Sequence, residues 1–233
     1  MVPFANGKGG VGKTSLACSY AVEQARKGAS VVLADLNDEQ QTATTWARVR
    51  DHNGILPRII VMAATPRRVI EMVGRYDFLV VDTPSWTDKN TLALAKAATF
   101  MVIPSGPNPS FDLEPTVRLL HGFHKEVLEV WRYGVALSRF RPDAKGAAEE
   151  EEFARAYLAQ AGYMALKGCV PNAPQLNTAL AQGYGLSEAG KGDATQHTVE
   201  LLGSIHTAVM SAERHLSKQR TQSLSRDSGG RER

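Results

Sequence analysis

The sequence has few cysteines, no long hydrophobic run and little net charge. Its 233 residues include only two cysteines, Cys18 and Cys169, which excludes a disulfide framework and favours a reduced, cytoplasmic setting. No apolar stretch approaches the roughly 18 residues of a membrane span. The first expected strand begins so near the N-terminus that we expect no signal peptide. The formal net charge of +3, from 27 basic and 24 acidic residues, is too small to indicate a nucleic-acid-binding protein by itself.

Short apolar runs alternate with helical patterns along the chain, and 43% hydrophobic residues suffice for a full core. Runs such as 31–33 and 78–81 are apolar on both faces, which is typical of parallel strands covered by helices on each side. The pattern predicts an α/β fold: one domain with a mostly parallel twisted sheet and helices on both faces. The expected strands are 2–6, 30–35, 58–63, 78–82, 99–103, 134–138 and 165–170. The expected helices are 15–27, 39–51, 66–75, 88–97, 112–130, 148–161 and 194–216.

Residues 7–14 read G-K-G-G-V-G-K-T, which fits the phosphate-loop spacing G-x-x-x-x-G-K-[ST]. A backbone that wraps phosphate oxygens with its own N–H groups needs residues without a Cβ, hence the glycines. Lys13 would bring positive charge to the β- and γ-phosphates, and the Thr14 hydroxyl would bind Mg²⁺. The apolar run before the loop and the helical pattern after it separate a phosphate loop from a chance match. We therefore expect a nucleotide site here.

Two acidic residues end strands that are expected beside this loop. Asp35 closes the run 31–35, and Asp82 closes the run 78–82 in the Walker-B pattern, where the acid holds the Mg²⁺ shell. Ligands bind at the carboxyl edge of parallel sheets, so both acids are candidates for one site. The alternative for each acid is a helix N-cap. A further strand leads into a proline-rich loop, 105–110, which is neither helix nor strand.

Together these motifs resemble the ParA/MinD family of deviant Walker ATPases. Within it, the chain is most similar to the short ParA-type partition proteins without an N-terminal DNA-binding extension. The resemblance covers about residues 2–210. It rests on the stretches 8–14, 34–37, 80–84, 102–104 with the proline-rich loop, Asp112-Leu113, and 183–188.

The resemblance implies a single-domain P-loop ATPase over residues 1–216 that uses ATP and Mg²⁺. Lys8 resembles the signature lysine that crosses a dimer interface to the partner's nucleotide. Thr14, Asp35 and Asp82 match positions around the magnesium ion. The implied catalytic residues are Lys8, Lys13, Asp35, Asn37 and Asp38. The implied nucleotide-binding residues are Gly7, Lys8, Gly9, Gly10, Val11, Gly12, Lys13, Thr14 and Ser15, with Pro171 and Asn172 at the adenine base.

One departure from the family concerns the residues after the second strand. Relatives usually read D-x-D-P there, whereas this chain reads Asp35-Leu36-Asn37-Asp38. An amide can hold a water molecule but cannot take its proton or add negative charge. Either Asp38 takes over the role of the second acid, or turnover is slow.

The resemblance implies an ATP-driven positioning protein that is cytoplasmic and nucleoid-associated. Such a protein forms an ATP-dependent homodimer, binds nonspecific DNA and releases it when a cargo-bound, ParB-like adaptor triggers hydrolysis. The commonest cargo is a plasmid or chromosome. The alternatives are a MinD-like protein on a membrane, a carboxysome- or conjugation-type positioning ATPase, an ATP-binding scaffold with very slow hydrolysis, and a small-molecule kinase.

Two features weigh on these alternatives. An apolar stripe over 199–216 is long enough to be core, and only Leu224 is large and apolar beyond it, which argues against a membrane anchor. A kinase would need an Arg-rich lid, and the stretch 139–141 is too short. The tail 217–233 is basic and polar, and we expect it to be disordered. Candidate DNA-contacting residues are Arg214, Lys218 and Arg220, with Arg67 and Arg68 elsewhere.

Overall fold

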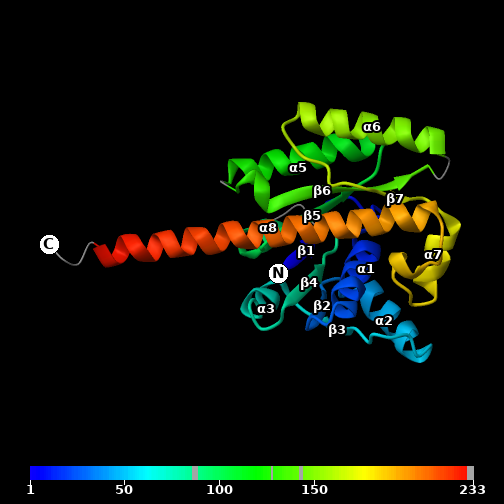
Figure 1. Ribbon diagram of the computed structural model, residues 1–233, viewed down its shortest axis with the longest axis horizontal. Helices are drawn as coiled ribbons and strands as arrows, with labels where there is room; N and C mark the ends of the chain where they lie inside the picture. The colour runs from blue at the N-terminus through cyan, green and yellow to red at the C-terminus, as the bar shows by residue number, and fades with distance from the viewer. Residues whose placement is uncertain (86–88, 127, 142–143, 230–233) are drawn as a thin grey trace.

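The computed structural model describes residues 1–85, 89–126, 128–141 and 144–229 (Figure 1). Within them, seven strands form one sheet in the order β3-β2-β4-β1-β5-β6-β7, and every pairing is parallel. This confirms the expected α/β fold. The strands are β1 Val2–Phe4, β2 Val31–Asp35, β3 Ile60–Ala63, β4 Phe78–Asp82, β5 Met101–Ser105, β6 Tyr133–Phe140 and β7 Val170–Pro171.

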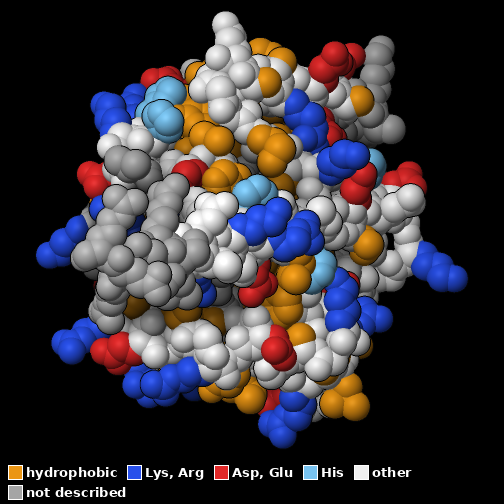
Figure 2. All heavy atoms as spheres, turned by 60° about the vertical axis from the view of Figure 1, so that its left-hand side comes forward, with side chains coloured by type: hydrophobic (Ala, Val, Ile, Leu, Met, Phe, Trp, Pro, Cys, Tyr) orange, Lys and Arg blue, Asp and Glu red, His pale blue; other side chains and the backbone are white. Residues whose placement is uncertain are grey.

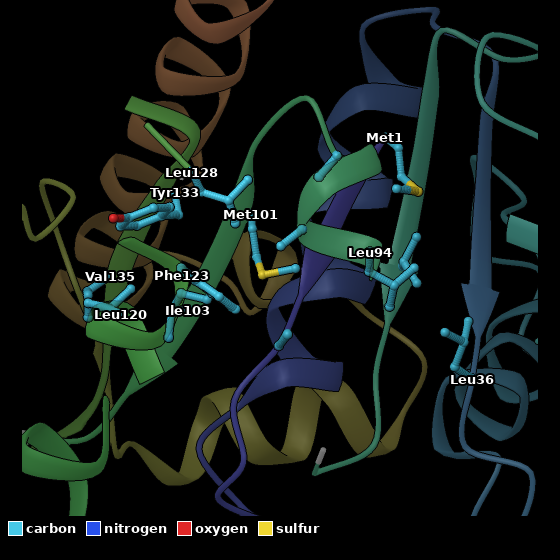
Figure 3. Close-up of a cluster of buried hydrophobic side chains, with 14 of the residues drawn as sticks. Met1, Leu36, Leu94, Met101, Ile103, Leu120, Phe123, Leu128, Tyr133 and Val135 are labelled. Carbon is cyan, nitrogen blue, oxygen red and sulfur yellow. The ribbon is translucent and has the colours of Figure 1, made fainter. Parts of the chain in front are cut away.

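Helices cover both faces of the sheet, as the doubly apolar strands predict. One face packs against α1, α2, α7 and α8, and the other against α3, α4, α5 and α6. Figure 3 shows part of the second core, where Leu120 and Phe123 lie beside Ile103 of β5; Leu94 and Met101 belong to the same cluster. The helices are α1 Lys13–Arg26, α2 Thr42–His52, α3 Pro66–Glu71, α4 Lys89–Ala97, α5 Glu114–Lys125, α6 Ala144–Gln160, α7 Pro174–Ala181 and α8 Asp193–Gly229.

Several expected elements are shorter in the structure, the strand 165–170 and the helix 112–130 among them. The expected strand 165–170 keeps only a single bridge at Ala165 before Gly168 turns the chain with φ +76°, and pairing with β6 resumes at β7 with a shift in register. The expected helix 112–130 begins as the π-helix η1 Pro109–Leu113, continues as α5 and ends at Lys125. Three-residue 3₁₀ turns follow at η2 Val130–Arg132 and η3 Leu186–Glu188.

The last helix, α8, is longer than expected. Its apolar stripe packs on the body through Leu202, Ile205, Val209 and Ala212, although Val199, expected in that stripe, is exposed. The structure differs from the expected disorder over 217–229, because α8 continues unbroken to Gly229. No glycine or proline interrupts residues 204–228, so nothing local ends the helix. Residues 230–233 lie outside the described residues. In Figure 1 this end of α8 projects beyond the sheet and its covering helices.

Length alone does not make α8 a membrane segment. Among the described helices, none combines the length and the apolar character that crossing a bilayer would require.

Candidate nucleotide site

The phosphate loop connects β1 to α1 at the carboxyl edge of the sheet. Gly10 and Gly12 have φ angles of +70° and +89°, a conformation that L side chains rarely adopt. Gly12 is also the N-cap of α1, and no side chain caps this helix end. The first N–H groups of α1 therefore face the loop without a side-chain acceptor, which is the arrangement that suits a phosphate.

The Lys13 side chain folds back onto the phosphate loop. Its ammonium donates to the Lys8 carbonyl oxygen at 2.8 Å and to Ser85 Oγ at 3.0 Å. Burial lowers the pKa of Lys13, and the nearby Asp82 carboxylate acts in the opposite direction. The lysine is thus a largely desolvated cation fixed at the loop, which strengthens its attraction for phosphate oxygens. Ser85 was not singled out from the sequence.

Asp82 and Thr14 meet as the Walker-B pattern predicts. The Thr14 hydroxyl donates to Asp82 Oδ2 at 2.7 Å, and the carboxylate is 2% exposed. Its other oxygen, Oδ1, is buried and has no hydrogen-bond partner. Burial raises the pKa of Asp82 to about 7; the Asp35 carboxylate also raises it, and the Thr14 hydrogen bond and Lys13 oppose the shift. A buried carboxylate oxygen without a partner needs an explanation, and a hard cation is a fitting one.

Asp35 lies beside Asp82, because β2 and β4 pair these two residues in register. Its environment is different. Oδ1 accepts from the Asn37 N–H at 3.1 Å, and Oδ2 accepts from the Thr44 N–H at 3.0 Å and its hydroxyl at 3.1 Å. Thr44 is in the first turn of α2, whose N-cap residue Gln41 offers no side-chain bond. Asp35 therefore stabilises the start of α2 from the end of β2, although the N-cap position itself belongs to Gln41. Its place around magnesium stays a prediction.

The loop after β2 contains the departure from the usual acid. Asn37 Oδ1 accepts from the Gln40 N–H at 3.1 Å, and Asn37 Nδ2 donates to Gln40 Oε1 at 3.2 Å. Asp38 is exposed. The amide of Asn37 thus closes a turn within its own loop, and the catalytic roles of both residues stay predictions.

Lys8 forms an ion pair with Asp112 of η1. Asp112 is buried and also accepts from the Asn108 N–H at 3.2 Å. Gly106 makes room for it, since a Cβ there would stand 2.5 Å from Asp112 Oδ2. Lys8 would have to leave Asp112 before it could reach a second subunit. This contact could not be predicted from the sequence, because 104 positions separate Lys8 from Asp112.

Pro171 and Asn172 line a small cavity beside the phosphate loop. The cavity has a volume of about 110 Å³ and is also lined by Gly10, Gly12 and Ser15. The two residues therefore lie beside the phosphate loop, and their contact with an adenine base stays a prediction. The lining also includes residues that were not predicted for this site, among them Ser138, whose hydroxyl donates to the Val11 carbonyl at 2.7 Å, and Arg139, which has φ +64°. A positive φ at an arginine has no sequence signal.

The stretch 183–188 holds the far end of α2. The guanidinium of Arg50, fully buried, donates to Glu188 through both terminal nitrogens, at 2.7 and 3.2 Å. Gly183 packs directly on Arg50, where a Cβ would approach the Arg50 backbone nitrogen to 2.5 Å. With Asp35 at its start and Glu188 near its end, α2 is fixed at both ends.

Comparisons with known proteins agree with this geometry. The family model described as the CobQ/CobB/MinD/ParA nucleotide binding domain matches residues 2–186. The maintenance of carboxysome distribution protein A of Gloeobacter kilaueensis is 35% identical over 156 residues, which are 65% of this chain and 68% of that protein. The chromosome-partitioning ATPase Soj of Thermus thermophilus is 32% identical over 133 residues, 44% and 53% of the two chains.

A solved structure shows the same fold. The septum site-determining protein MinD of Pyrococcus horikoshii, in complex with Mg-ADP, superposes with a TM-score of 0.66 over 88% of this chain and 94% of that chain. The two sequences are 16% identical, so this likeness concerns the fold alone.

Proposed function

The chain belongs to the CobQ/CobB/MinD/ParA nucleotide-binding domain family, and on that premise we propose that it is an ATP-hydrolysing positioning protein of the ParA/MinD type. It forms a homodimer on ATP, binds nonspecific DNA and answers to an adaptor protein on its cargo. The observation that carries the ATP site is the set of Lys13, Thr14 and Asp82 at one loop, with one oxygen of Asp82 buried and without a partner.

The residues fit a magnesium nucleotide. Thr14 and Asp82 would hold Mg²⁺, which keeps several of its ligands as water and phosphate oxygens. The ion would supply charge neutralisation on the phosphates. Lys13 offsets the charge of the β- and γ-phosphates, and the loop N–H groups bind and orient them. The Mg-ADP complex of the Pyrococcus horikoshii protein supports this assignment. Asn37 leaves the attacking water without a carboxylate at the family's usual position, so intrinsic hydrolysis is slow.

DNA segregation is the proposed role, with carboxysome-type positioning as the second candidate. The name of the Thermus thermophilus relative supports the first and that of the Gloeobacter kilaueensis relative the second. Arg214 and Lys218 are exposed one turn apart on α8 and favour contact with phosphates. Arg67 and Arg68 both form ion pairs with Glu71, which makes them weaker candidates for contact with DNA. On the face shown in Figure 2, Lys and Arg side chains are spread among acidic ones. We therefore expect each subunit to bind DNA weakly and the dimer to bind more tightly, because two sites act together.

The phosphate-loop assignment is tested by Lys13→Ala with Lys27→Ala as its matched control. Lys27 is an exposed lysine just beyond the other end of α1. We expect Lys13→Ala to weaken the binding of a fluorescent ATP analogue at least about 100-fold, because the main cation on the phosphates is gone. Lys27→Ala should bind as the wild type does. Wild-type affinity in Lys13→Ala would overturn the assignment.

The positioning role is tested by steady-state ATPase assays with and without DNA, and by DNA binding over a salt series. We expect stimulation by DNA and an affinity that falls steeply with salt, in proportion to the phosphates neutralised. Binding of ATP without any turnover would favour the scaffold, and ATP-dependent binding to liposomes instead of DNA would favour a membrane protein. Either result would contradict the proposed role while leaving the nucleotide site intact.

A further inference from the structure

A rigid apolar rim stands beside the phosphate loop. We define the proline rim as residues 107–111, P-N-P-S-F. Its last residue, Phe111, lies on η1 and is 70% exposed. The next residue is Asp112, which holds Lys8 of the phosphate loop. A large aromatic side chain is therefore presented to solvent directly beside the proposed nucleotide site.

Polar contacts hold the rim in place. Asn108 Oδ1 accepts from the Phe111 N–H at 3.0 Å, and the Asn108 carbonyl accepts from the Asp112 N–H at 2.9 Å. Pro107 and Pro109 flank Asn108 and restrict the backbone further. The backbone at Phe111 is thus held in place, so little backbone entropy is lost when a partner covers this residue.

The segments on either side of the rim are joined to Asn6, which lies between β1 and the phosphate loop. Asn6 Nδ2 donates to the Pro104 carbonyl at 2.8 Å and to Thr116 Oγ1 at 3.1 Å. Thr116 in turn donates to Ser105 Oγ at 3.1 Å. These buried contacts and the Lys8–Asp112 ion pair fix the rim relative to the loop, where Gly9 and Gly10 are also exposed. A body that covers the exposed loop would meet the rim as well.

Single exposed apolar side chains are common on protein surfaces and need no explanation alone. Phe111 differs in that an asparagine cap between two prolines holds its backbone in place, at the one edge where a ligand is proposed. The exposed Phe153 of α6, by contrast, lies on a plain helix surface and packs against Tyr157. Aromatic side chains, phenylalanine among them, are enriched at protein–protein interfaces.

We propose that Phe111 is the apolar anchor with which a second copy of this chain docks over the phosphate loop. This inference rests on the proposed function, which requires an ATP-dependent dimer. A second copy fits this edge because it would bring bound phosphates toward Lys8, which is one third exposed and lies on the same edge as the exposed Phe111. In a twofold-symmetric dimer the same residue is used on both subunits, so each substitution removes two anchors.

The test compares Phe111→Ser with Phe153→Ser. Both replace an exposed phenylalanine with a small polar residue, but only Phe111 adjoins the phosphate loop. The dimer dissociation constant is measured by analytical ultracentrifugation in Mg²⁺ with a slowly hydrolysed ATP analogue. We expect Phe111→Ser to weaken the dimer at least about 30-fold, because an interface anchor of this size contributes that much. Phe153→Ser should dimerise as the wild type does.

Nucleotide affinity of the monomer is the check on folding, and it should be equal in all three proteins. Phe111→Leu keeps an apolar side chain and should recover most of the dimer. A wild-type dimer that Phe111→Ser leaves unchanged would overturn the inference but not the proposed function. A wild type that binds ATP and stays monomeric would overturn the proposed function itself. Vesicle binding that depends on Phe111, without dimerisation, would assign this residue to a membrane and also overturn the inference.

Discussion

Asp35 and Asp82 occupy equivalent positions at the ends of the neighbouring strands β2 and β4, yet their surroundings differ. Both end parallel strands, both are buried, and the sheet pairs them in register. Asp35 receives three hydrogen bonds from its own chain, whereas Asp82 receives one and keeps an oxygen without a partner. The chain after β2 returns as α2, and Asn37 and Thr44 in this segment donate hydrogen bonds to Asp35. An acid that the fold satisfies stabilises the fold, and an acid that the fold leaves unsatisfied is available to a ligand.

The two acids also act on each other. Asp35 adds negative charge beside Asp82 and so raises the pKa of Asp82 beyond the effect of burial, while Lys13 partly offsets it. A divalent cation at Asp82 would relieve this repulsion. The structure is therefore arranged so that the cost of burying one carboxylate falls when metal and nucleotide bind.

The largest expected effect comes from Asp82→Asn. The amide keeps the size of the side chain but cannot neutralise a cation, so ATP turnover should fall at least about 100-fold. The folded state should remain, because the variant removes a buried charge that the fold does not satisfy. ATPase rates and the rise in melting temperature on adding Mg-ATP measure both points. Retained magnesium-dependent stabilisation in Asp82→Asn would mean that another group holds the ion.

The second prediction concerns the other acid. Asp35→Ala should lower the free energy of unfolding by about 2 kcal/mol, because the start of α2 loses its acceptor and a backbone N–H is left without a partner. Urea denaturation measures this loss. Thr44→Val is the matched control: it removes the hydroxyl bond to Asp35 alone and should cost about 1 kcal/mol or less.

The same pair of variants tests the magnesium role of Asp35. If Asp35 acts mainly on α2, the Mg-ATP affinity of Asp35→Ala should fall less than about tenfold at saturating magnesium. A loss as large as that of Asp82→Asn, with stability unchanged, would reverse the comparison and make Asp35 the metal ligand.

The fold and the centre of the site follow from local sequence patterns. The strand 78–82 matches residue for residue, since a doubly apolar run with a terminal acid leaves few alternatives. The phosphate loop, Thr14 and Asp82 are adjacent in the structure because their strands are neighbours. These features depend on periodicity and on residues close together in the chain.

Contacts between residues far apart in the chain could not be predicted from the sequence. Whether a strand-end acid caps a helix or faces a ligand depends on where the next helix returns, and Thr44 follows Asp35 by nine residues with no distinguishing pattern. The Lys8–Asp112 ion pair and the exposure of Phe111 depend on how η1 packs beside the loop. The left-handed Arg139 lies within β6, where the register against β7 shifts between Ser138 and Phe140, and no residue preference predicts this.

The smallest expected effect is the change in unfolding free energy with pH, which should come from Asp82. In metal-free buffer, Asp82 has a pKa raised to about 7 in the folded chain, against 3.8 when unperturbed. The folded state then binds a proton that the unfolded state has lost, so this group contributes stability that is complete below pH 3.8 and disappears as pH rises through about 7.

The slope cannot exceed about 1.4 kcal/mol per pH unit, the value for one proton. Asn does not titrate, so the difference in unfolding free energy between the wild type and Asp82→Asn isolates the contribution of Asp82. That difference should shift steadily against the wild type as pH rises from about 4 to 7. Urea denaturation in EDTA at several pH values measures it. Parallel stability curves for the two proteins would mean that Asp82 is charged throughout this range, and that the fold satisfies it as well as it satisfies Asp35.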